Sequence, residues 1–356
     1  MDSLFKDNLI SGFIEKLEAG IITYLEHDYL KKIITSFMLI QQYNKIRSQK
    51  TESIILRYYS WLIKNNHVIP LSPKLKTEYF LLKTAIEKYF HFFSIKIQNQ
   101  RTKQYSQFEQ LQILAEFWGH YLSRQEDEIL KFLTFFIEKI YEVPAHFTNE
   151  IFNLLYSTWR PILSPIAAIP QKKFSLEEIE GYFFGEINKQ TFESHILQNA
   201  DLLFSITNPQ FTNHLFLPKQ DNFDIFEAAL VVHEFQHIQD SSRVHETSLF
   251  VSEKSALNAE RIFLNILGTG KRGKFCWLES NLFYPLLLLK WELDIILSDA
   301  YDINNFYALC QNHSMNPIGL SPLFDWGAPF QMSAYCAATM DLEPNWKSYL
   351  RELGET

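Results

Sequence analysis

The chain has few cysteines, and they lie far apart. Only three occur in 356 residues, Cys276, Cys310 and Cys336, and no two of them form a CxxC pair. A disulfide framework needs paired cysteines, and a thiolate zinc site needs closely spaced ones. The sequence therefore argues against both, and a reducing, cytoplasmic location is expected.

Signals for export, membrane insertion and nucleic-acid binding are also scarce. The N-terminus, MDSLFKDNLI, has an acid at position 2 and no long apolar run, unlike a signal peptide. Export by a route without such a signal stays open. The most apolar window, FYPLLLLKW, is too short to cross a bilayer. The formal net charge is -8, and the densest basic run, Lys271, Arg272 and Lys274, fits a solvated turn. We therefore expect neither nucleic acid nor a membrane as partner.

Glycine and proline are scarce up to about Tyr141, outside the connection NNHVIPLSPK. Apolar residues recur there at helical spacing, which predicts a bundle. Prolines then cluster in and around WRPILSPIAAIPQKK, which marks a boundary because proline interrupts a regular helix. We predict a mainly α (α+β) protein, with a helical region over 1–143 and a catalytic region with a short sheet over 144–356.

Local patterns place several elements in the second region. Ser175, with Glu178 three residues later, forms the capping box that opens a helix. The segment HLFLP, residues 214–218, has the composition of a short strand between turn-rich flanks. A helix is predicted over residues 252–267, closed by the two glycines of LGTG.

The most informative segment is DIFEAALVVHEFQHIQD, which begins at Asp224. Asp224 is placed to cap a helix, and Glu227 to reach back to it. His233 and His237 are four residues apart, so a helix of 3.6 residues per turn puts both imidazoles on one face. Two ring nitrogens so placed are suited to bind one metal ion.

Glu234 lies about 100° round the predicted helix from His233, where it would face a water molecule on the ion. A carboxylate there is suited to remove a proton from that water, because the ion lowers the pKa of water to near neutrality. The pattern therefore indicates a catalytic metal site with Glu234 as general base.

Two histidines need a further protein ligand, and FVSEKSALNAERIFLNIL offers two candidates. Glu253 follows His237 by sixteen residues and precedes an apolar helix face. Glu260 is seven residues further on, roughly on the same face. We predict Glu253 as the third ligand and keep Glu260 as the alternative.

The segment HEFQH followed by SEKSALNAE resembles the gluzincin branch of zinc metallopeptidases. In that branch a second helix supplies a Glu ligand, often in an ExxA context. The resemblance extends from about residue 214 to 267. It implies Zn²⁺ bound by His233, His237 and Glu253, with Glu234 as the base that hydrolyses a peptide or protein substrate.

The run FLPKQDNFDIFEAALVVHEFQH is also similar to the HExxH-containing peptide β-hydroxylases, which depend on iron and 2-oxoglutarate. That resemblance implies Fe²⁺ on His233 and His237 and an Arg or Lys that binds the cosubstrate carboxylate. The FY-x-P-type stretch expected after the motif is absent, so the zinc peptidase is preferred. A third hypothesis is a helical binding module with an inactive site.

Further residues have weaker support from the sequence alone. Asp240 is a candidate to accept the N–H of a ligand histidine. Tyr301 is predicted as donor to the oxyanion of the reaction, with Tyr307 and His313 as alternatives. His245 does not fit the metzincin spacing. The strand over 214–218 is expected to pair with an extended peptide.

Overall fold

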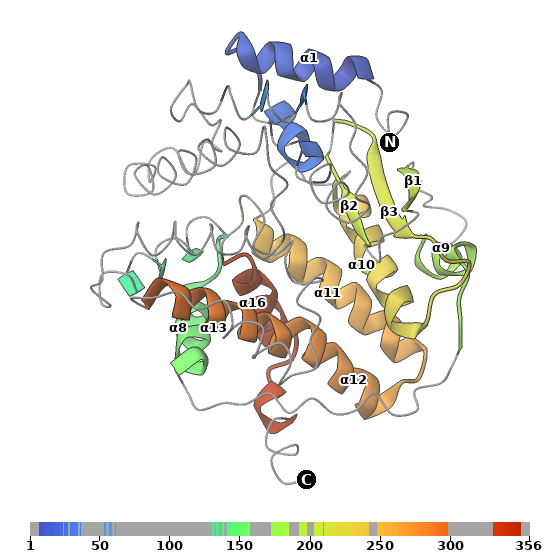
Figure 1. Cartoon of the computed structure of the whole chain (residues 1–356). Coiled ribbons are helices and arrows are strands. Elements are labelled where there is room, and N and C mark those ends of the chain that lie inside the picture. Colours follow the sequence, from blue (N-terminus) through green and yellow to red (C-terminus); the bar gives the residue numbers. More distant parts are fainter. Residues whose placement is uncertain are drawn as a thin grey trace. The chain divides into compact units, whose positions relative to one another are not determined.

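A computed structural model shows how the second part of the chain is folded (Figure 1). It describes residues 7–36 except 24, 28 and 35; positions 53, 54, 57, 58 and 61; 130–138 in part; 141–156; 172–184; 192–197; 203–220 except 209; 221–241; 248–297; and 330–349. Tyr301, Tyr307, His313 and His245 lie outside these described residues.

The chain forms two compact units, residues 1–139 with 293–329, and residues 140–292 with 330–356. The first contains α1 (Asp7–Glu18), whose buried Ile10, Ile14 and Leu17 share one face at helical spacing. The border predicted between residues 143 and 144 stays a prediction.

The second unit contains most of the described helices. They are α8 (Ala145–Tyr156), α9 (Leu176–Phe184), α10 (Ile225–Ser241), α11 (Leu249–Ile266), α12 (Gly270–Leu278), the π-helical turn η1 (Glu279–Phe283), the first part of α13 (Tyr284–Leu297) and α16 (Met332–Leu342). Together with the small sheet described below, they confirm the prediction of a mainly α (α+β) fold.

The predicted helix boundaries are largely confirmed. Ser175 and Glu178 form the capping box of α9, with N–H to oxygen distances of 2.8 and 3.2 Å. The helix predicted over 252–267 begins slightly earlier, at Leu249, because Ser248 accepts a hydrogen bond from the N–H of Val251.

The basic run after α11 lies in a helix and not in the predicted turn, although Lys271 and Arg272 are exposed to solvent as expected. Gly268 and Gly270 adopt positive φ angles of 69° and 61°, which glycine allows at low cost. The chain therefore turns within a few residues, and the basic residues 271, 272 and 274 lie inside α12.

A three-stranded sheet lies beside α10 (Figure 1). Its strands are β1 (Phe192–Leu197), β2 (Phe204–Ile206) and β3 (Asn213–Pro218), in the order β1-β3-β2. β1 is parallel to β3, and β2 is antiparallel to it. The predicted strand is thus confirmed, but it is central. The expectation that it pairs with a peptide is wrong, because β1 and β2 already occupy both of its sides.

The two faces of the sheet carry different side chains. Leu215 of β3 pairs with Ser205 of β2, whereas His214 pairs with Ile206. Because successive residues of a strand point to opposite faces, Ser205 and Leu215 lie on one face and His214 lies on the other. The four residues His214 to Leu217 are all buried, so both faces of β3 are covered.

Three helices form the part of the core that holds the HExxH residues. α11 packs against both α10 and α16. The contact side of α11 includes the fully buried Ala256 and Leu257. In α16 the small residues Ala334, Ala337 and Ala338 are fully buried as well, which allows the two helix backbones to approach closely.

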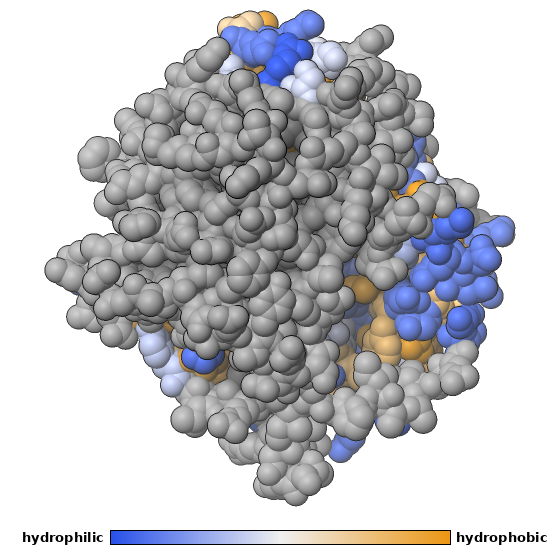
Figure 2. All heavy atoms as spheres, in the orientation of Figure 1, coloured by the Kyte–Doolittle hydropathy of each residue, from blue (hydrophilic) through white to orange (hydrophobic). Residues whose placement is uncertain are grey.

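Among the described residues, no helix is long and apolar enough to span a bilayer. Around α9 the exposed side chains are mostly hydrophilic (Figure 2), and they include Lys172, Lys173, Glu177 and Glu178.

Candidate metal centre

α10 begins where the sequence predicts. The backbone N–H groups of Phe226 and Glu227 donate to Asp224 Oδ1 over 2.8 and 2.9 Å. The N–H of Asp224 donates in turn to Glu227 Oε2 over 2.7 Å. This reciprocal cap satisfies N–H groups that have no partner within the helix, and it fixes the position of the first turn.

The two motif histidines lie on the same side of α10. His233 is buried among apolar helix neighbours, and His237 is half-buried one turn later. Their Nε2 atoms are 3.0 Å apart, and the ring planes meet at 78°. The two imidazoles therefore direct the same ring atom toward a common point.

Glu253 of α11 reaches that point from the neighbouring helix. Its Oε2 lies 3.3 Å from Nε2 of His233 and 3.6 Å from Nε2 of His237. The carboxylate is buried, with only 4% of the residue exposed. The structure thus brings the three predicted ligand residues together.

This arrangement suits a tetrahedral metal ion. Ligands at roughly 2.0–2.1 Å from zinc lie about 3.3 Å from one another in a tetrahedral shell. The three separations between the donor atoms of His233, His237 and Glu253 are 3.0, 3.3 and 3.6 Å. Oε2 of Glu253 is a buried oxygen that receives no hydrogen bond from the described residues. A cation between the three donors would satisfy it.

Glu260 is not placed as the third ligand. Its Oε1 lies 2.7 Å from Nδ1 of His233, on the side of the ring that faces away from His237 and Glu253. The contact is an ion-pair distance, and neither atom has a hydrogen bond among the described residues; the negative charge of Glu260 favours a proton on Nδ1, which leaves the lone pair of Nε2 for the metal position.

A second contact holds Glu260 itself. The amide of Asn281 in η1 donates to Glu260 Oε2 over 2.9 Å. The backbone carbonyl of Asn281 accepts from the Thr339 hydroxyl of α16 over 3.0 Å. π-Helical turns are rare and frequently occur at functional sites. Here the turn places a side chain that orients Glu260, and Glu260 in turn contacts His233.

The partner of His237 differs from the one predicted. Its Nδ1 lies 3.0 Å from the hydroxyl of Ser252 in α11. Asp240 accepts a hydrogen bond from Gln236 over 2.7 Å instead. Asp240 lies three residues after His237 in the helix, whereas the adjacent helix brings Ser252 directly against the ring.

Burial and charge act together on His233 and Glu253. Burial alone would lower the pKa of His233, but contacts with Glu253 and Glu260 raise it well above its ordinary value. Burial would raise the pKa of Glu253, but His237 and His233 lower it below its ordinary value. The carboxylate therefore stays ionised, which is the form that binds a cation.

Glu234 points toward the sheet. Its Oε2 accepts a 2.6 Å hydrogen bond from the hydroxyl of Ser205 in β2. Ser205 lies on the sheet face turned to α10, so the strand holds this carboxylate in one orientation. The sequence analysis did not identify Ser205, because the contact joins residues 29 positions apart.

Tyr335 of α16 is a further residue at the centre that the sequence analysis missed. Its ring lies parallel to that of His233, with 6.2 Å between the centroids and 6° between the planes. Burial, and then the negative charges of Glu253 and Glu234, raise the pKa of Tyr335 well above its ordinary value. The phenol therefore keeps its proton at neutral pH and can donate it in a hydrogen bond.

Comparison of the chain with protein-family models, with curated proteins and with solved structures found no match. What the centre does must therefore be inferred from its own residues.

Proposed function

We propose that the protein is a zinc-dependent metallopeptidase that hydrolyses peptide bonds with Glu234 as general base. The observation that carries the proposal is the convergence of two imidazole nitrogens and one buried carboxylate oxygen within 3.0–3.6 Å of one another. Three protein ligands leave one position of a tetrahedral ion open, as catalytic zinc sites require. Glu234, next to His233 in the chain, supplies the base.

Each polar residue has a role in this reaction. Zinc, when bound, would lower the pKa of water and polarise the substrate carbonyl. His233, His237 and Glu253 hold the ion. Glu234 accepts the proton of the attacking water and then delivers it to the leaving amine. Ser205 donates to one oxygen of Glu234 and leaves Oε1 available for that proton transfer.

We assign the role of oxyanion donor to Tyr335; Tyr301, predicted for this role from the sequence, lies outside the described residues. The Tyr335 hydroxyl is protonated and borders the same carboxylates as the metal position. A donor there stabilises the negative charge that develops on the carbonyl oxygen in the transition state.

The edge strand β2 is the place where we expect an extended peptide substrate to pair with the sheet. β2 is one of the two edge strands of the described sheet, with β1 on the other edge, and its central residue contacts the proposed base. An extended peptide paired with the outer side of β2 would run past Glu234, since main-chain hydrogen bonds add a strand to an open sheet edge. This replaces the pairing expected for the central strand.

Iron-dependent peptide hydroxylation remains the second candidate, because two histidines and one carboxylate are also the ligand set of non-haem iron oxygenases. That reaction needs a basic residue for 2-oxoglutarate. The described basic residues of α11 have other partners. Lys254 pairs with Asp341, and Arg261 donates to the carbonyl of Leu342 and to the side chain of Asn258. Neither of these two residues of α11 is therefore available to bind 2-oxoglutarate.

The deciding experiment compares Glu234→Gln with Asp240→Asn, a matched change on the same helix at a carboxylate that contacts Gln236. The zinc-loaded proteins are assayed on a library of quenched-fluorescent peptides. We expect Glu234→Gln to keep its zinc but lose at least about 100-fold in activity, because general-base catalysis contributes factors of that order. Asp240→Asn should retain activity.

Three outcomes would contradict the proposal. Undiminished hydrolysis by Glu234→Gln would show that this carboxylate is not the base. Consumption of 2-oxoglutarate by the iron-loaded protein, without peptide cleavage, would favour the hydroxylase. Absence of any bound metal would favour a binding module with an inactive site.

A further inference from the structure

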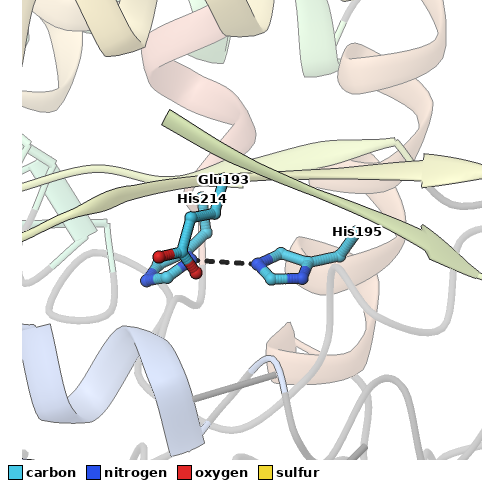
Figure 3. A group of neighbouring side chains, drawn as sticks. All are labelled: Glu193, His195 and His214. Carbon is cyan, nitrogen blue, oxygen red and sulfur yellow. Dashed lines mark hydrogen bonds and ion pairs between the residues drawn. The ribbon is translucent and has the colours of Figure 1, made fainter. Parts of the chain in front are cut away.

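A second group of metal-binding side chains lies on the sheet face that carries His214. Nε2 of His195 in β1 is 3.0 Å from Nδ1 of His214 in β3. Oε2 of Glu193 in β1 lies 3.7 Å from the same His214 atom. One donor atom from each residue falls within 4.8 Å of the other two. Figure 3 shows the three side chains extending to the same side of the strands.

Strand pairing explains why these residues meet. Glu193 and His195 are two apart in β1, so both point to one face of the sheet. In the parallel ladder Glu193 is the Cα partner of His214, and His195 is the partner of Phe216. Neighbouring partners share a face, so the backbone itself brings the carboxylate and both imidazoles together.

The surroundings of these three side chains favour binding of one shared ion over separate hydration of each side chain. His195 and His214 are buried, and Phe216 stacks on the His195 ring with 4.8 Å between centroids. Phe204 stacks on Phe216 in turn at 4.5 Å. An apolar wall of this kind lowers the local dielectric and strengthens the attraction between a cation and its ligands. The Glu193 side chain is 52% exposed, which gives an ion access from solvent.

Two imidazole rings whose nitrogens lie 3.0 Å apart either share one proton or bind one metal ion. Two positive rings 3.0 Å apart would repel each other strongly in a buried site. Two neutral rings can share one proton between their nitrogens, or both lone pairs can bind one cation. The nearby carboxylate favours the cation, because it adds negative charge and a third donor atom. Its distance of 3.7 Å is close to the separation of about 3.3 Å expected between zinc ligands.

We propose that Glu193, His195 and His214 form a second divalent-metal site, which takes Zn²⁺ and joins β1 to β3. The site is separate from the centre on α10. His214 lies on the sheet face opposite to Ser205, the residue that contacts Glu234. It has its own ligands and does not depend on the proposed peptidase activity. Its effect is structural, since the ion bridges two strands that meet as a parallel pair.

The first test counts zinc in the purified full chain after loading with ZnCl₂ and gel filtration. We expect two ions per chain in the wild type. The His195→Ala variant and the His233→Ala/His237→Ala double variant should each retain one. His146→Ala is the matched control, because His146 is exposed on α8 outside both groups, and it should retain two.

The second test measures zinc binding at the site of Glu193, His195 and His214 alone, in a variant that lacks the first site. The His233→Ala/His237→Ala variant lacks the first site, so any rise in its melting temperature with added ZnCl₂ must come from ions bound elsewhere. We expect a rise that disappears when His214→Ala is added and shrinks when Glu193→Gln is added. Retention of one zinc by the wild type and none by the double variant would overturn the proposal. A double variant whose melting temperature does not change with added ZnCl₂ would overturn the proposal as well.

Discussion

The strongest prediction concerns Glu260, which orients a proposed ligand without reaching the metal position. Its carboxylate contacts Nδ1 of His233 at 2.7 Å, and Asn281 holds its other oxygen. Replacement by Ala removes the group that keeps the proton on Nδ1. His233 would then adopt the other tautomer part of the time, and its Nε2 lone pair would not be directed at the ion.

The size of the effect follows from the kind of contact. Loss of a partner that orients a metal-bound histidine typically weakens metal binding about 10–100-fold, or roughly 1.4–2.8 kcal/mol. Glu260→Ala should fall near the upper end, because the contact is short and buried. Asn281→Ala should lie near the lower end, because it leaves the carboxylate in place and removes only its donor.

The assay is a competition titration of zinc between each variant and a chromophoric chelator. Glu177→Gln, at an exposed residue of α9, controls for the loss of a carboxylate. Asn265→Ala, at an exposed residue of α11, controls for the loss of an amide. Both controls should bind zinc like the wild type. Circular dichroism checks that the helices remain, since removing one partner of a buried ion pair also costs stability.

Zinc affinity of Glu260→Ala within about twofold of the wild type would refute this reasoning, because the predicted loss is at least about tenfold. Equal losses in Glu260→Ala and Asn265→Ala would also refute it, since they would indicate a general effect on α11 rather than an effect on His233.

Three further predictions follow from neighbouring residues. Ser205→Ala should lower kcat about tenfold with KM little changed, because it removes a hydrogen bond to a charged carboxylate; an unchanged kcat would contradict this. Tyr335→Phe should lower kcat about 100-fold at unchanged zinc content. Tyr182→Phe, at an exposed tyrosine of α9, should leave kcat unchanged. Burial raises the pKa of Glu279 to about 7, so this residue destabilises the fold progressively as pH rises from about 4.5 through 7. Glu279→Gln should therefore match the wild type in thermal melts near pH 4.5 but be more stable by roughly 1–3 kcal/mol at pH 8; equal stability at both pH values would contradict this.

The predictions confirmed from sequence were those that depend on local geometry. The caps at Ser175 and Asp224 each need only a side chain and the backbone of the following turn. The spacing of His233 and His237 likewise fixes their shared face through the helical repeat alone. For this reason the element boundaries near the centre agree with the sequence analysis to within a few residues.

The choice between Glu253 and Glu260 could not be made in this way. Seven residues of helix turn almost a whole number of times, so both carboxylates share a face and differ by about 10 Å along the axis. Which one meets Nε2 of His233 depends on how far α11 is shifted along α10, and tertiary packing decides that shift. Ser205 and Tyr335 were missed for the same reason, because each reaches the centre from an element distant in sequence.

The charges at the centre give a further reason to expect a cation. Glu253 and Glu260 are buried against His233, and the charges of both, together with that of Glu234, act on Tyr335. Three carboxylates against two imidazoles leave excess negative charge in a poorly solvated place, which is costly unless a cation balances it. Bound Zn²⁺ should therefore stabilise the fold by about 2.7 kcal/mol at a free concentration 100 times its Kd, which corresponds to a rise of roughly 4 °C in Tm for a chain of 356 residues. A chelator should reverse the rise in the wild type. The part of the shift due to this centre should be absent in His233→Ala/His237→Ala, and a full shift in that variant would mean that the stabilising ion binds elsewhere.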